Sequence, residues 1–126
     1  MRETPLWTWH VIAGLIILVL AGLHMGIMHL NVVLDMEAFN PNHENAIDWA
    51  NVVHRGKQVF FAWSYVVLLG AALFHGLYGL RTILFELNPS AGLRTAIVGV
   101  LLVGGVGLFV LGTWAAFAAR TLALAE

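Results

Sequence analysis

Three long stretches of the chain are apolar and contain no Asp, Glu, Lys or Arg. They cover residues 4–34, 58–80 and 95–119. Each is longer than the roughly 20 residues that a helix needs to cross the hydrocarbon core of a bilayer. Because a backbone inside lipid must satisfy its own hydrogen bonds, these stretches should be helical. The pattern therefore predicts an all-α membrane protein, one domain over residues 1–126 with transmembrane helices at about 7–34, 58–87 and 94–121.

Two polar segments separate the apolar stretches. Residues 35–57 form a long loop with four of the seven acidic residues, and we expect a surface helix over 46–53. Residues 88–92, Asn-Pro-Ser-Ala-Gly, form a short turn, so the second and third helices should be antiparallel neighbours. Lys and Arg are divided three against three between the two sides, so the charge distribution does not fix the orientation. Tryptophans near the helix ends are typical of aromatic belts: Trp7, Trp9, Trp63 and Trp114.

The composition excludes several classes of protein. The chain has 126 residues, of which 60% are hydrophobic and 10% charged, and its mean hydropathy is +0.86. A soluble domain averages about 25% charged residues. The net charge of −1 provides no basic patch for nucleic acid. The absence of cysteine excludes disulfides, zinc–thiolate sites, iron–sulfur ligation and thioether-linked haem, so any metal chemistry falls on the six histidines.

Two histidines lie well inside predicted membrane helices, where a polar side chain is costly and is often functional. His24 and His75 each fall a few residues beyond the middle of their helix. Since the helices run in opposite directions, the two imidazoles should differ in depth by roughly 10 Å. Both axial nitrogens of one haem must lie about 2 Å from the iron, a length similar to that of Zn–N bonds. The spacing favours two b-type haems, each sharing its ligation with another chain, over one haem held by both residues. Proton or quinone chemistry and a structural hydrogen bond between helices are the alternatives.

The third apolar stretch has no ionisable residue and is rich in glycine. Gly99, Gly104, Gly105, Gly107 and Gly112 lie within it. Small residues allow membrane helices to approach closely, so we interpret this stretch as a packing helix.

Two motifs resemble a known family. The first apolar stretch, with Leu-Trp-Thr-Trp at 6–9, Ala-Gly at 13–14 and Gly-Leu-His-Met-Gly-Ile-Met at 22–28, resembles the fourth transmembrane helix of dihaem cytochrome b subunits of quinol:fumarate reductases. Leu-Phe-His-Gly-Leu-Tyr-Gly-Leu at 73–80 resembles the fifth helix of that subunit and the His-x-x-x-Gly helix of succinate dehydrogenase anchors. The chain thus resembles the C-terminal half of the dihaem subunit, as in members whose anchor is divided into two small subunits.

The resemblance implies positions and roles for individual residues. His24 would bind the iron of the haem distal to the iron–sulfur subunit, and His75 that of the proximal haem. Arg55, twenty residues before His75, matches an arginine beside a haem propionate, with contact to a lipid phosphate as the alternative. The N-terminus would be cytoplasmic, in the inner (cytoplasmic) cell membrane, and the 35–57 loop would lie outside.

Two positions depart from the family pattern. Glu86 stands where dihaem relatives have a basic residue, and a carboxylate cannot pair with an ionised propionate. Arg81, or a group on another chain, is then the expected propionate partner near the inner side. Leu87 stands where single-haem relatives have a tyrosine that contacts quinone, so a quinone site of that kind would lack this contact.

The expected function is that of a membrane-anchor subunit of succinate:quinone oxidoreductase, either succinate dehydrogenase of the tricarboxylic acid cycle or fumarate reductase. The dicarboxylate chemistry would take place on a flavoprotein subunit with FAD. Electrons would pass between an iron–sulfur subunit and membrane quinone through haem b, and a second anchor chain would complete the helical bundle. Two neutral imidazoles would keep each iron six-coordinate and suited to electron transfer. The alternatives are a haem-free structural anchor and a small transporter or assembly protein.

A further expectation concerns the outer end of the first helix. His29, Asp35 and Glu37 would exchange protons at an outer quinol site, or would simply be polar residues at the membrane interface.

Overall fold

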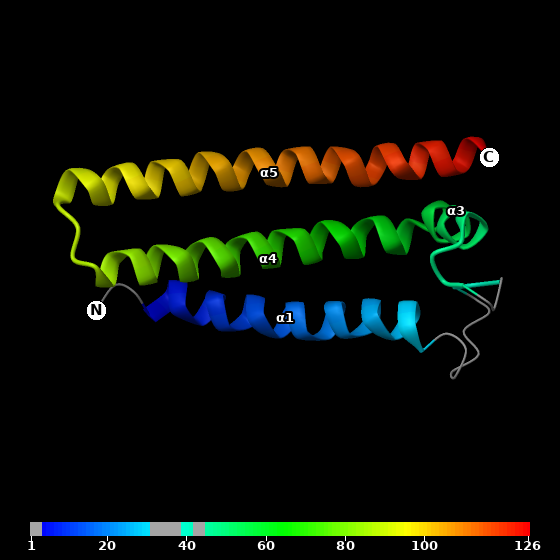
Figure 1. Ribbon diagram of the computed structural model, residues 1–126, viewed down its shortest axis with the longest axis horizontal. Helices are drawn as coiled ribbons and strands as arrows, with labels where there is room; N and C mark the ends of the chain where they lie inside the picture. Colours follow the sequence, from blue (N-terminus) through cyan, green and yellow to red (C-terminus); the bar gives the residue numbers. More distant parts are fainter. Residues whose placement is uncertain (1–3, 31–38, 42–44) are drawn as a thin grey trace.

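The computed structural model describes residues 4–30, 39–41 and 45–126, and its regular structure over these residues is entirely helical. Three long helices, α1 (Thr4–His29), α4 (Val59–Glu86) and α5 (Ala91–Ala125), lie side by side in one layer (Figure 1). The short helix α3 (Trp49–Lys57) lies at one end of this layer, beside the start of α4 and the end of α5. The prediction of an all-α fold with three membrane helices is confirmed.

The ends of the helices differ from the predicted ends in informative ways. The second helix, expected at 58–87, is α4 at 59–86, whereas the third, expected at 94–121, is α5 and extends to 91–125. It continues past Arg94 and Arg120 because a long cationic side chain can reach the membrane surface from within a helix. The first helix was expected to reach residue 34, but α1 ends at His29, and residues 31–34 lie outside the described residues. The surface helix begins three residues later than expected, after Asp48.

The three long helices are apolar and long enough to cross a membrane. The candidate spans have 25, 28 and 35 residues. At about 1.5 Å per residue, even the shortest exceeds a hydrocarbon core of about 30 Å. The chain is therefore a multi-pass membrane protein.

Helix α4 is the centre of the layer, because α1 packs against one of its sides and α5 against the other. Among the described helices, α1 contacts α4 only. The small buried core includes Ala13 and Ile27 of α1 and Phe61 and Val66 of α4. A single layer leaves both of its broad faces open, so most of the apolar side chains are available to lipid or to partner helices.

The contact between α4 and α5 uses two of the glycines in the third apolar stretch. A Cβ atom at Gly105 would collide with Leu77, and one at Gly112 would collide with Leu69. A Cβ atom at Gly104 or Gly107 would meet nothing within 4 Å. The prediction of a packing helix is thus confirmed for the glycines that face α4.

The turn between α4 and α5 makes them antiparallel, as predicted. Asn88 has a φ of 51°, in the left-handed region that Asn tolerates better than most residues. Arg94, in the first turns of α5, stabilises this turn. Its guanidinium donates hydrogen bonds to the Asn88 side chain and to the Pro89 carbonyl, each with a donor–acceptor distance of 3.0 Å.

Candidate functional site

His75 lies half-buried between α4 and α1, with its ring orientation fixed by the neighbouring helix. Its Nδ1 is 3.0 Å from the backbone carbonyl oxygen of His10. A carbonyl oxygen can only accept a hydrogen bond, so Nδ1 carries the proton and donates it. The lone pair is then on Nε2, the nitrogen that remains for a metal ion.

Two residues of α1 form the surface on which the His75 imidazole rests. The His10 ring stacks on it, with ring centroids 4.0 Å apart and an interplanar angle of 9°. A Cβ atom at Gly14 would lie 3.1 Å from Cε1 and 3.2 Å from Nδ1 of His75, so the missing side chain provides room for the ring. The His10 Nδ1 atom is buried and has no hydrogen-bond partner among the described residues. The sequence did not mark His10 as a partner of His75.

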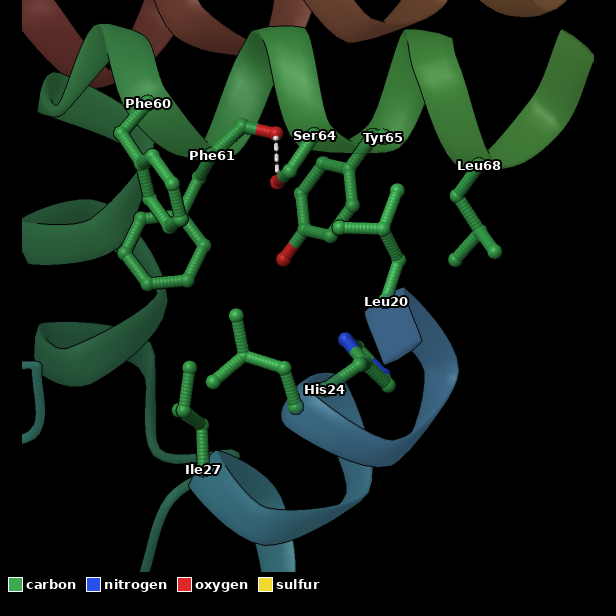
Figure 2. A pocket seen from close by; sticks show the side chains of 9 residues that line it. Leu20, His24, Ile27, Phe60, Phe61, Ser64, Tyr65 and Leu68 are labelled. Carbon is green, nitrogen blue, oxygen red and sulfur yellow. Dashed lines mark hydrogen bonds between the residues drawn. The ribbon is translucent and has the colours of Figure 1, made fainter. Parts of the chain in front are cut away.

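The interface between α1 and α4 forms a seam along the two helices. His75 lies toward one end of this seam, and His24 lies toward the other. Its ring meets Tyr65 edge-on, with centroids 6.0 Å apart and an interplanar angle of 73°. Figure 2 shows His24 and the Tyr65 hydroxyl turned toward a small space between the helices. This space measures about 20 Å³ and is otherwise lined mainly by apolar side chains. It has room for a water molecule but not for a macrocycle. A large planar ligand on His24 would have to approach from an open face of the layer.

The structure separates the two histidines in depth. His24 is level with Tyr65, and Tyr65 precedes His75 by ten residues on the same helix. At 1.5 Å per residue this corresponds to about 15 Å along α4, compared with the roughly 10 Å expected from the sequence. One iron cannot bind both imidazoles within this chain.

Arg55 is buried beneath the segment that precedes α3. It is 4% exposed, and it donates hydrogen bonds to the Asn40 side-chain oxygen and to the Ala46 carbonyl. The distance to the Ala46 oxygen is 2.6 Å. Asn40 in turn donates a hydrogen bond to the Ile27 carbonyl on α1, with a donor–acceptor distance of 2.9 Å. Burial lowers the pKa of the Arg55 guanidinium, while the hydroxyl of Tyr65 acts in the opposite direction. The group stays charged, because an arginine side chain is not deprotonated in proteins.

Asn40 and Asn51 are fully buried, although no pattern in the sequence predicts a role for either residue. Asn51 donates to the Asn45 carbonyl at a distance of 2.7 Å, whereas Asn40 donates to the Ile27 carbonyl of α1. Each asparagine thus binds a backbone carbonyl from an earlier part of the chain. An asparagine near Pro41 is typical of a turn, so its burial has no clear signal in the sequence.

Arg81 lies six residues beyond His75, at the opposite end of the layer from Arg55. Its guanidinium carbon is 4.6 Å from the centre of the Phe85 ring and 5.9 Å from that of Tyr78. Glu86 and Leu87 are exposed nearby. His24 and Arg55 thus both lie beside Tyr65. Arg81 lies beside Tyr78, which follows His75 by three residues on α4.

The other predicted residues give less information. His29 is exposed at the end of α1, whereas Asp35 and Glu37 lie outside the described residues. In the described part of the chain, no three His, Cys, Asp or Glu side chains come together as a group that could hold a metal ion.

Comparisons with known proteins identify the family. No family model matches the chain, and no solved structure matches it. The succinate dehydrogenase hydrophobic membrane anchor subunit of Archaeoglobus fulgidus is 33% identical over 92 residues, which cover 73% of this chain and 68% of that protein. With three membrane helices and this extent of similarity, the chain belongs to the family of succinate dehydrogenase hydrophobic membrane anchor subunits.

Proposed function

We propose that this chain is a haem b-binding membrane-anchor subunit of succinate:quinone oxidoreductase, which connects an iron–sulfur subunit with membrane quinone. The observation that carries the proposal is the pair of half-buried histidines, His24 and His75, at two depths of one seam in a membrane-anchor protein. The proposed partners are a flavoprotein subunit with FAD, the iron–sulfur subunit and a second anchor subunit. The proposed location is the inner cell membrane, with the N-terminus on the cytoplasmic side.

The surroundings of His75 suit a residue that would hold a haem. The His10 carbonyl accepts a hydrogen bond from Nδ1–H, and this bond orients the ring and directs the basic Nε2 away from that contact. Gly14 leaves the space that the ring occupies. A bound haem b would supply a one-electron redox centre, and a pair of haems would each take one ligand from this chain and one from the second anchor subunit.

The two arginines suit the charge of such a group. Arg55 lies near Tyr65 on the side of His24, and Arg81 lies near Tyr78 on the side of His75. Each supplies a positive charge toward its own end of the layer, where the carboxylates of a haem would need neutralisation.

Substitution of the histidines tests this assignment. In the assembled complex, His24→Ala and His75→Ala should each remove one of two b-haem components from the reduced-minus-oxidised spectrum. His29→Ala, at an exposed position of the same helix as His24, is the matched control and should keep both components. The proposal fails if neither His24→Ala nor His75→Ala changes the b-haem spectrum.

A haem-free structural anchor is the second candidate function. It is favoured by the His75–His10 hydrogen bond, which joins α1 to α4 without any cofactor. An intact purified complex that contains flavin but no stoichiometric haem would support this candidate. The family membership gives no support to a transporter or an assembly factor.

A further inference from the structure

A pocket of about 360 Å³ lies where α3 covers the ends of α4 and α5. Its volume is in the range of small-molecule sites, about 300–1,000 Å³. Most of its lining is apolar, but Arg55 of α3 and Arg120 of α5 both contribute to its wall. The described residues that line it include no Asp or Glu. Two cations therefore share one pocket, and none of the described side chains around it is a carboxylate.

Arg120 is the less satisfied of the two. Its Nε atom is buried and has no hydrogen-bond partner among the described residues. Arg55, by contrast, already donates to Asn40 and Ala46. Arginine cannot lose its charge in a protein, and a buried donor without a partner is costly. Both guanidinium groups are therefore suited to an anionic ligand in this pocket.

The pocket adjoins the cavity beside His24. Phe61 and Tyr65 line both spaces, and Met28, one helical turn after His24, lines the larger one. An anionic group in the larger pocket would thus lie next to whatever binds at His24. Continuity with this histidine favours the carboxylates of a cofactor held there over an unrelated anion.

We propose that Arg120 is a carboxylate-binding residue for the haem that His24 would ligate, and that it acts together with Arg55. The proposal rests on the proposed haem function. Arg120 would donate from its Nε, which has no partner among the described residues, and Arg55 would add a second positive charge from α3. A carboxylate accepts charge-assisted hydrogen bonds from guanidinium groups readily.

The test is a redox titration of the b-haems in the purified complex with Arg120→Gln and Arg120→Lys. A positive charge near the iron disfavours the ferric state, so its removal should lower the midpoint potential. We expect Arg120→Gln to change the reduction equilibrium of one component by on the order of tenfold, which corresponds to about 59 mV for one electron. That component should be the one lost in His24→Ala. Arg120→Lys should keep a potential near that of the wild type.

Arg94→Gln is the matched control, because it removes one cation at the opposite end of α5. It should leave the His24-dependent component unchanged. If Arg120→Gln leaves both components unchanged while haem is present, the role of Arg120 is overturned. The same is true if Arg120→Gln changes no potential but loses a co-purifying anionic phospholipid, because the anion is then a lipid phosphate. A wild-type complex without haem overturns the proposed function itself, together with this inference.

Discussion

Gly14 decides how closely α1 approaches the His75 ring. A methyl group there would lie 3.1–3.2 Å from two ring atoms, so Gly14→Ala should displace the imidazole from the His10 carbonyl. Overpacking of this kind costs roughly 1–3 kcal/mol. We expect a lower thermal unfolding midpoint of the complex and a lower b-haem content per protein.

Gly22→Ala in the same helix is the control, because its new Cβ would meet nothing within 4 Å. This variant should match or exceed the wild type in stability, since alanine favours a helix by up to about 1 kcal/mol. Equal behaviour of the two variants would contradict the steric role of Gly14.

Asn40 connects the segment before α3 to both Arg55 and the α1 backbone. Asn40→Ala removes the acceptor of a buried guanidinium and the donor to the Ile27 carbonyl. Leaving such groups unsatisfied costs about 1–3 kcal/mol each, so the unfolding midpoint should fall clearly. Lys57→Ala, at an exposed position of α3, should leave it nearly unchanged. A similar result for both variants would show that the buried network contributes little.

The sequence could single out His24 and His75 because histidine is rare and costly inside an apolar helix. It could not reveal the partners of His75, which are the backbone carbonyl of His10 and the space at Gly14. Neither a backbone carbonyl nor a missing side chain can be recognised from composition or residue spacing. Arg55 was selected through a family resemblance. Its burial beneath Asn40 and Ala46 depends on the path of the polar segment, which no periodicity specifies.

At the scale of elements, α3 and α5 touch through two small residues. A Cβ atom at Gly56 would lie 2.8 Å from the Cβ of Ala123, an atom whose position the backbone fixes. Gly56→Ala should push α3 away from α5 and lower the unfolding midpoint of the complex.

The exchange of the two residues provides the control. Adding Ala123→Gly to Gly56→Ala removes the colliding atom, so the double variant should recover most of the lost stability. No recovery would mean that Gly56 is needed for backbone reasons other than this contact.

The long helices were predictable because an uncharged apolar run of this length has one stable form in lipid. Their ends were less predictable. Arg94 and Arg120 lie inside α5, so a charge does not mark its limits. Helix α3 begins later than the composition suggested, because its position depends on contacts with α4 and α5.

At the scale of the whole molecule, three helices in one layer form an incomplete bundle. The exposed apolar side chains include Trp7, Leu18, Val100 and Trp114 on helices that contact few neighbours. Both faces of the layer are open to lipid or to other membrane helices, which agrees with a subunit of a larger anchor (Figure 1). Under the proposed function, each haem would take one ligand from this chain, at one of two depths, and the other from the second anchor chain.

The ratio of haem b to flavin in the complex purified through this chain tests the central claim most directly. Two haems per flavin, with a b-type reduced-minus-oxidised spectrum, is the result predicted for His24 and His75 on separate irons. A complex with flavin but no haem would contradict the account, and would leave the chain as an anchor whose His75 serves only to join α1 and α4.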